Sequence, residues 1–147
     1  MHSAFRVVIA SALVATATFV ISADTTPASQ ASEIQLRIGD LLFSEGRYSD
    51  SLDAYRNSLK TAPPDATRRP RMGVIASALR VAEFGLARQE AEKLHQSDPI
   101  GPDATALYAD ALWSSGLFQE AEGGYRDALA GASRCSKGTY RRSPGPR

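Results

Sequence analysis

Cysteine and histidine are almost absent from this chain of 147 residues. Cys135 is the only cysteine, so no disulfide can form within the chain and its stability has to come from packing. His2 and His95 are the only histidines, which leaves too few ligands for a zinc site built from cysteine and histidine. The sequence also lacks a nucleophile elbow, a phosphate loop and a dinucleotide-binding fingerprint. It therefore predicts no catalytic site, no metal site and no cofactor.

The chain carries little excess charge of either sign. It has 17 basic and 16 acidic residues, and the formal net charge is +1. The basic residues gather in residues 134–147, which contain no acidic residue, so the preceding part of the chain is mildly acidic. A basic face is what nucleic-acid-binding domains need. The composition therefore favours no nucleic-acid partner.

Long apolar runs are missing except near the N-terminus. Residues 7–23 carry no charge, follow Arg6 and end in small residues. A basic start, an apolar middle and a small-residue exit are typical of a secretory signal peptide. We expect residues 1–23 to be a cleaved signal peptide, residues 24–31 to be a polar linker, and the protein to be periplasmic or secreted. The alternative is a membrane anchor formed by residues 7–23, a run at the lower limit for spanning a bilayer.

What the sequence does contain is a repeated pattern of large and small residues. Three copies are found: Gly46-Tyr48-Ser51-Tyr55-Ser58, Ala82-Phe84-Ala87-Ala91-Leu94 and Gly116-Phe118-Ala121-Tyr125-Ala128. Spacings of three and four residues put the aromatic and small side chains on one face of a helix. A second apolar pattern precedes each copy, at about residues 32–45, 69–81 and 103–115. Recurrence at 34 to 36 residues indicates three stacked helix pairs.

These residues are similar to a known family pattern. Ile38-Gly39 is followed by Leu42, the aromatic and small residues come next, and Pro63 ends the unit, which resembles the tetratricopeptide repeat. The resemblance implies an all-α fold, a short right-handed α-solenoid of three repeats at about residues 32–65, 68–99 and 102–132. The middle repeat matches only in part.

The alignment of that middle repeat has two solutions. Ile75 occupies the position of Gly39 and Ala109 if the turn between the helices keeps its length. Ala76 occupies that position if the turn is one residue shorter. Elsewhere the pattern has a direct physical reading, because Gly46 and Gly116 permit tight turns.

Residues 133–147 have no apolar periodicity and are rich in Gly, Ser, Pro and Arg, so we expect a disordered basic tail. The third repeat then lacks a capping helix. A partner or self-association would cover it. Alternatively, the chain is the N-terminal docking part of a larger envelope enzyme.

The resemblance also implies a function and a site. Proteins of this family usually bind extended peptides on the concave wall formed by the first helices, so we expect a non-catalytic scaffold or adaptor for a protein or peptide partner. The predicted site consists of Asp40, Phe43, Leu79, Arg80, Asp110 and Trp113. Phe43, Leu79 and Trp113 form one row and Asp40, Ala76 and Asp110 the row beside it. The alternative is that Phe43 and Trp113 pack on neighbouring helices. Glu92 and His95 are expected on the solvated outer side.

Overall fold

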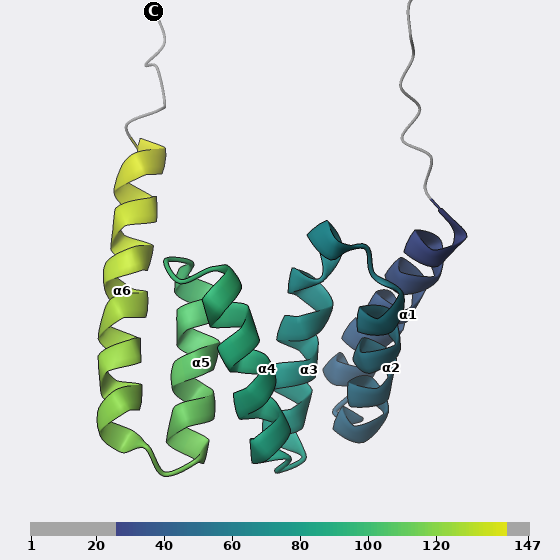
Figure 1. Cartoon of the computed structure of the whole chain (residues 1–147), viewed down its shortest axis with the longest axis horizontal. Helices are drawn as coiled ribbons and strands as arrows, with labels where there is room; N and C mark the ends of the chain where they lie inside the picture. The colour runs from purple at the N-terminus through teal and green to yellow at the C-terminus, as the bar shows by residue number, and fades with distance from the viewer. Residues whose placement is uncertain (1–25, 141–147) are drawn as a thin grey trace, which may run out of the picture.

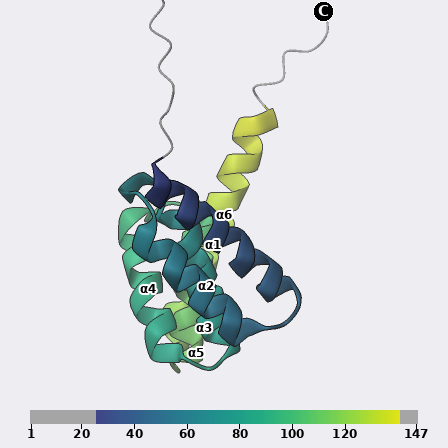
Figure 2. The same cartoon turned by 90° about the vertical axis from the view of Figure 1, so that its right-hand side faces the viewer.

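The computed structural model describes residues 26–140, with side chains described up to residue 134. This part of the chain folds into six α-helices and one short 3-10 helix. They are α1 (Pro27–Ser44), α2 (Tyr48–Thr61), η1 (Pro64–Ala66), α3 (Arg68–Arg80), α4 (Phe84–Ser97), α5 (Pro102–Ser114) and α6 (Phe118–Tyr140). Each helix packs mainly on its neighbours in sequence, and α3 also contacts α1 and α5. The result is an all-α helical stack with α1 at one end and α6 at the other (Figures 1 and 2).

Three helix pairs, α1–α2, α3–α4 and α5–α6, are each closed by a connection of three residues. The middle residue of each connection has a left-handed backbone: Gly46 (φ 78°), Ala82 (φ 61°) and Gly116 (φ 80°). The next N–H then bonds the carbonyl five residues back: Arg47 to Leu42 (2.9 Å), Glu83 to Ala78 (2.9 Å) and Leu117 to Leu112 (3.0 Å). This is the six-to-one bond of a Schellman motif. Because the connections have equal length, Ile75 and not Ala76 occupies the position of Gly39 and Ala109.

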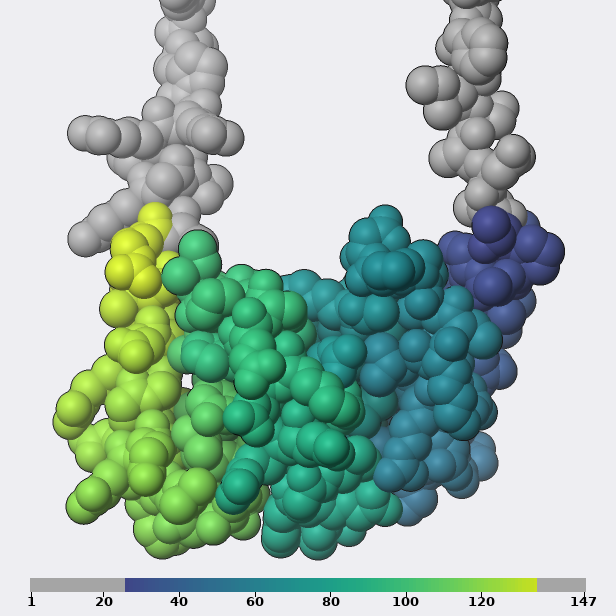
Figure 3. All heavy atoms as spheres, viewed as in Figure 1, coloured from purple at the N-terminus to yellow at the C-terminus, as the bar shows by residue number. Residues whose placement is uncertain are grey.

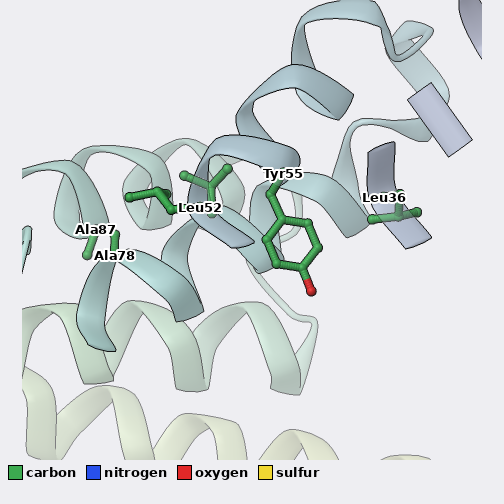
Figure 4. Packing of buried hydrophobic residues seen from close by; sticks show 6 residues of the cluster. Leu36, Leu52, Tyr55, Ala78 and Ala87 are labelled. Atoms are coloured by element: carbon green, nitrogen blue, oxygen red, sulfur yellow. The ribbon is translucent and has the colours of Figure 1, made fainter. Parts of the chain in front are cut away.

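Tyr55 is the centre of the first hydrophobic core. It is only 5% exposed, and its ring lies between Gly39 of α1 and Gly73 of α3. A Cβ atom would stand 2.6 Å from the ring at Gly39 and 2.5 Å at Gly73, so only glycine fits at either position. Ser51 is fully buried beside it and donates a hydrogen bond to the carbonyl of Gly39 (3.0 Å). Leu36, Leu52, Ala78 and Ala87 belong to the same cluster (Figure 4).

In the second core, large and small side chains stand at the opposite positions from those in the first core. Ala91 stands at the position of Tyr55, and Ile75 at the position of Gly39. Both are fully buried, and Leu107, at the position of Gly73 on the next first helix, packs against their cluster. A small residue now lies between two large ones, where the first core has a large residue between two small ones. This exchange keeps the interior filled, and it explains why the middle copy matches the repeat pattern poorly.

Two helices are longer than the sequence suggests. α1 begins at Pro27, where Thr26 Oγ1 accepts a hydrogen bond from the Ser29 N–H (3.2 Å), so most of the expected linker is helical. α6 continues to Tyr140 and does not end near residue 132. Prolines follow α2 and α4 closely, but Ser133 stands at the corresponding position of the third pair, and no proline occurs from there to Tyr140, so α6 continues through it.

The tail expected to be disordered from residue 133 is therefore helical over residues 133–140. The rest of that tail, and the expected signal peptide or anchor at residues 1–23, lie outside the described residues. Among the helices that the structure does describe, none is both long and apolar enough to cross a membrane.

Candidate functional site

The first helices of the three pairs, α1, α3 and α5, line a groove of about 500 Å³. We define the groove by its apolar floor and its charged edge. The floor includes Leu36, Met72, Ala76, Ala106 and Leu107. The edge carries Asp40, Arg69, Asp103 and Asp110. Because the three first helices each turn one face toward the groove, equivalent residues of successive repeats lie side by side, although they are about 35 residues apart in sequence.

Two of the carboxylates are held by tyrosine hydroxyls from the second helices. Tyr55 donates to Asp40 Oδ1 at 2.7 Å, and Tyr125 donates to Asp110 Oδ1 at 2.7 Å. Burial, followed by the bond to the carboxylate, raises the pKa of both phenols, and that of Tyr125 reaches about 12. Both hydroxyls therefore remain protonated donors at neutral pH and fix the two carboxylates at the groove edge.

The charge of the groove is negative. Arg69 Nη2 lies 3.3 Å from Asp40 Oδ2 and balances that carboxylate. Asp110 has no basic side chain within the described ion pairs, and Asp103 has only a distant one, Arg68 Nη2 at 4.0 Å. The groove therefore combines an apolar floor with two acidic groups that are not fully balanced.

Three of the six predicted site residues, Asp40, Phe43 and Asp110, line this groove. The other three, Leu79, Arg80 and Trp113, are not among its lining residues. Leu79 packs against both hydrophobic cores. The guanidinium carbon of Arg80 lies 5.6 Å from the centre of the Tyr48 ring.

Two members of the row Phe43–Leu79–Trp113 make aromatic contacts with the second helices. Phe43 meets Tyr48 edge-on at 5.1 Å between ring centres, and Trp113 meets Phe118 in the same way at 4.8 Å. Both second-helix aromatics follow directly after a three-residue connection, which brings them back over the end of the first helix. Trp113 is still 55% exposed, but it is not among the residues that line the groove.

One row of groove residues that the sequence analysis does not predict lies one helical turn closer to the N-terminus of each first helix than the row Asp40–Ala76–Asp110. Leu36, Met72 and Ala106 precede Asp40, Ala76 and Asp110 by four residues each. Side chains on a helix lean toward its N-terminus, so the surface beside a given row is shared with the row four residues earlier. The repeat spacing that aligns Asp40 with Asp110 also aligns these residues, so the signal was present in the sequence.

The region around His95 differs from its expected solvated state. His95 is half-buried and stacks on Tyr108 of α5, with ring centres 4.9 Å apart and planes 6° apart. Its Nδ1 atom is buried without a hydrogen-bond partner among the described residues. Glu92 is exposed as expected, whereas Glu90 is buried in ion pairs with Arg71 and with Lys93. No group of three His, Cys, Asp or Glu side chains that could hold a metal ion occurs in the described part of the chain.

A comparison of the chain with protein-family models and with curated proteins finds no match. Its resemblance to tetratricopeptide repeats therefore rests on the residue pattern and on the geometry of the helix pairs.

Proposed function

We propose that the three helix pairs are tetratricopeptide repeats of a right-handed solenoid, and that the chain is a non-catalytic scaffold or adaptor. In this proposal a protein or peptide partner lies in the groove, and neither a nucleic acid nor a small-molecule cofactor takes part. The observation that carries the proposal is the groove itself, lined in parallel by α1, α3 and α5. The equal connections and the repeated spacing of Tyr48, Phe84 and Phe118 support the repeat assignment.

The chemistry of the groove favours an extended peptide with apolar side chains and a lysine or arginine. Burying one such apolar side chain on the floor contributes about 1.5–3 kcal/mol. Asp103 and Asp110 would attract the basic residue, which adds specificity and association rate more than affinity. An acidic peptide would meet the same carboxylates and be repelled.

Selection from a random peptide library displayed on phage tests this proposal. We expect enrichment of peptides with apolar and basic residues. Ala76→Phe would place a ring in the middle of the groove and should abolish their binding. Asp103→Asn with Asp110→Asn should weaken binding by a smaller factor that shrinks at high salt, because exposed charges are screened; asparagine at 110 can still accept the Tyr125 hydroxyl.

Two control variants locate the surface. Trp113→Ala changes the row outside the groove and Glu92→Lys changes the outer side of α4, so both should bind the selected peptides normally. If Ala76→Phe binds them normally and Trp113→Ala does not, the site lies on the row Phe43–Leu79–Trp113. If only Glu92→Lys loses binding, the site lies on the outer face. Circular dichroism spectra of the variants should match that of the parent.

We also propose that the protein is exported and acts outside the cytoplasm, as the order of charged, apolar and small residues in 1–23 suggests. Expression in a bacterial host followed by intact-mass measurement of the exported fraction tests this. Loss of about 23 residues is expected. Retention of Met1 would favour an anchor formed by residues 7–23.

A further inference from the structure

α1 exposes an apolar stripe at positions where the later first helices are buried. Ile34, Ile38 and Leu41 are 57%, 40% and 60% exposed. The corresponding residues of α3 are Pro70, Val74 and Ser77, all buried. Val74 packs with Leu52 and Tyr55 of α2, and Ser77 Oγ lies 3.0 Å from Ser51 Oγ. The stripe on α1 therefore corresponds to the surface with which α3 contacts the second helix before it.

α6 exposes the opposite half of the same contact. Leu129 is 70% exposed, whereas His95, at the corresponding position of α4, stacks on Tyr108 of α5. Tyr125 is half-buried, whereas Tyr55 is covered on its second side by Gly73 of α3. Leu129 and Tyr125 therefore mark the face of α6 on which a following first helix would pack. The α6 end of the stack lies opposite the α1 end (Figure 3).

The lengths of the two end helices are complementary as well. α1 has 18 residues against 13 in α3 and α5, and its extra residues are at its N-terminus. α6 has 23 residues against 14 in α2 and α4, and its extra residues are at its C-terminus. Both extensions lie at the same edge of the stack (Figure 1). Consecutive helices run antiparallel, so an α1 packed on α6 would place the two extensions alongside each other.

We propose that copies of this chain stack head to tail, with α1 of one copy on α6 of the next in the orientation in which α3 lies on α2. The two surfaces differ, so the contact does not close on itself and forms open chains of copies. It involves the end faces and, of the groove residues, Asp110 at the edge, and it does not rest on the proposed function.

Steric fit and charge both predict a contact weaker than the inner ones. Arg37 takes the position of Gly73, where a Cβ atom would stand 2.5 Å from the tyrosine ring, so α1 would lie further from Tyr125 than α3 lies from Tyr55. The guanidinium of Arg37 pairs with Glu33 (3.0 Å). Glu33 takes the position of Arg69 and would face Asp110 where Arg69 pairs with Asp40. We therefore expect reversible, concentration-dependent assembly.

Sedimentation velocity of the purified chain, with its N-terminus defined by intact mass, tests the proposal from micromolar to millimolar concentration. The parent should form a series of species larger than a dimer. Leu41→Glu and Leu129→Glu should each be monomeric, with unchanged circular dichroism because both side chains are exposed. Gln89→Glu, which adds the same charge to the outer side of α4, should assemble like the parent.

Mixing distinguishes head-to-tail stacking from pairing of like faces. The Leu41→Glu chain keeps its α6 face and the Leu129→Glu chain keeps its α1 face, so their mixture should form a one-to-one dimer and nothing larger. Glu33→Arg should restore the Arg69–Asp40 type of pair and tighten assembly about twofold to fivefold at low salt. A parent that stays monomeric at millimolar concentration, a mixture that stays monomeric, or a Glu33→Arg chain that assembles more weakly would overturn the proposal.

Discussion

Ala82 occupies a backbone conformation that its two counterparts fill with glycine. Its φ of 61° lies in the left-handed region, as do those of Gly46 (78°) and Gly116 (80°). A residue with a Cβ atom pays roughly 1–2 kcal/mol in this region because the Cβ approaches the following carbonyl oxygen. Ala82→Gly should remove that strain. The side chain is exposed, so its loss removes little packing.

The net effect is smaller than the strain, because glycine also loses more freedom on folding. That entropic cost is about 0.4–1 kcal/mol. We therefore expect Ala82→Gly to raise the free energy of unfolding by about 0.5–1 kcal/mol. For a domain of this size the midpoint of thermal unfolding should rise by about 2–5 °C. Thermal and urea unfolding followed by circular dichroism measure both quantities.

A second alanine provides the matched control. Ala62 has φ −65° and ψ 136°, an extended backbone without strain. Ala62→Gly should therefore destabilise the fold by at least the entropic cost of about 0.4–1 kcal/mol, and the loss of a half-buried methyl group adds to it. Gly46→Ala should also destabilise it, because alanine there acquires the strain that Ala82 already has. If Ala82→Gly lowered the melting temperature as Ala62→Gly does, the left-handed backbone at residue 82 would be refuted.

Three further predictions concern the helix contacts. Tyr55→Ala should lower the free energy of unfolding by about 3–5 kcal/mol, and Tyr125→Ala should lower it less, since Tyr125 is covered on one side only. Urea unfolding measures both values, and a larger loss for Tyr125→Ala would contradict this prediction. Ser51→Leu should cost about 1–3 kcal/mol by overfilling a fully buried position, and equal stability to the parent would show that the close contact of α1, α2 and α3 is misplaced. The pKa of Tyr125 is about 12 in the folded chain against an ordinary 10, so the protonated phenol stabilises the fold below pH 10 and this contribution is lost as the pH rises from 10 to 12. Tyr125→Phe should show a shallower loss of stability over that range, and an unchanged slope would mean that the hydroxyl does not bond Asp110.

The sequence predicts the helix pairs well because their turns and contact residues have few alternatives. Gly46 and Gly116 do take the left-handed turns, and Tyr55 and Ser51 are buried as their spacing indicates. The middle pair is less predictable, because Ile75 and Ala91 exchange the sizes found at Gly39 and Tyr55. Whether a position in the core takes a large or a small side chain depends on the residues that face it from another helix. The pattern of one helix does not contain that information.

The candidate site and the helix ends were harder to predict for different reasons. The repeat spacing finds the correct helices and places Asp40 and Asp110 in one groove, but it does not say on which side of that row the groove extends. The register of the first helices places Trp113 in a row with Phe43 and Leu79, but it does not show that the ring contacts Phe118 and lies outside the groove lining. At the C-terminus, a composition rich in small and basic residues predicts disorder, but residues 133–143 contain no proline that would end α6.

The exchange of sizes between the two cores also fixes the order in which the helix pairs can stack. If α5 packed on α2 in place of α3, Leu107 would meet the ring of Tyr55 where Gly73 leaves room for it, and overfilling of this kind costs about 1–3 kcal/mol. If α3 packed on α4, Gly73 would meet Ala91 and leave a cavity in place of Leu107, at a cost of about 2–5 kcal/mol. Similar units in one chain are prone to pair with the wrong neighbour during folding. In this chain each inner contact accepts its own partner helix and disfavours the other. The order of large and small side chains therefore determines which helix pairs can pack together.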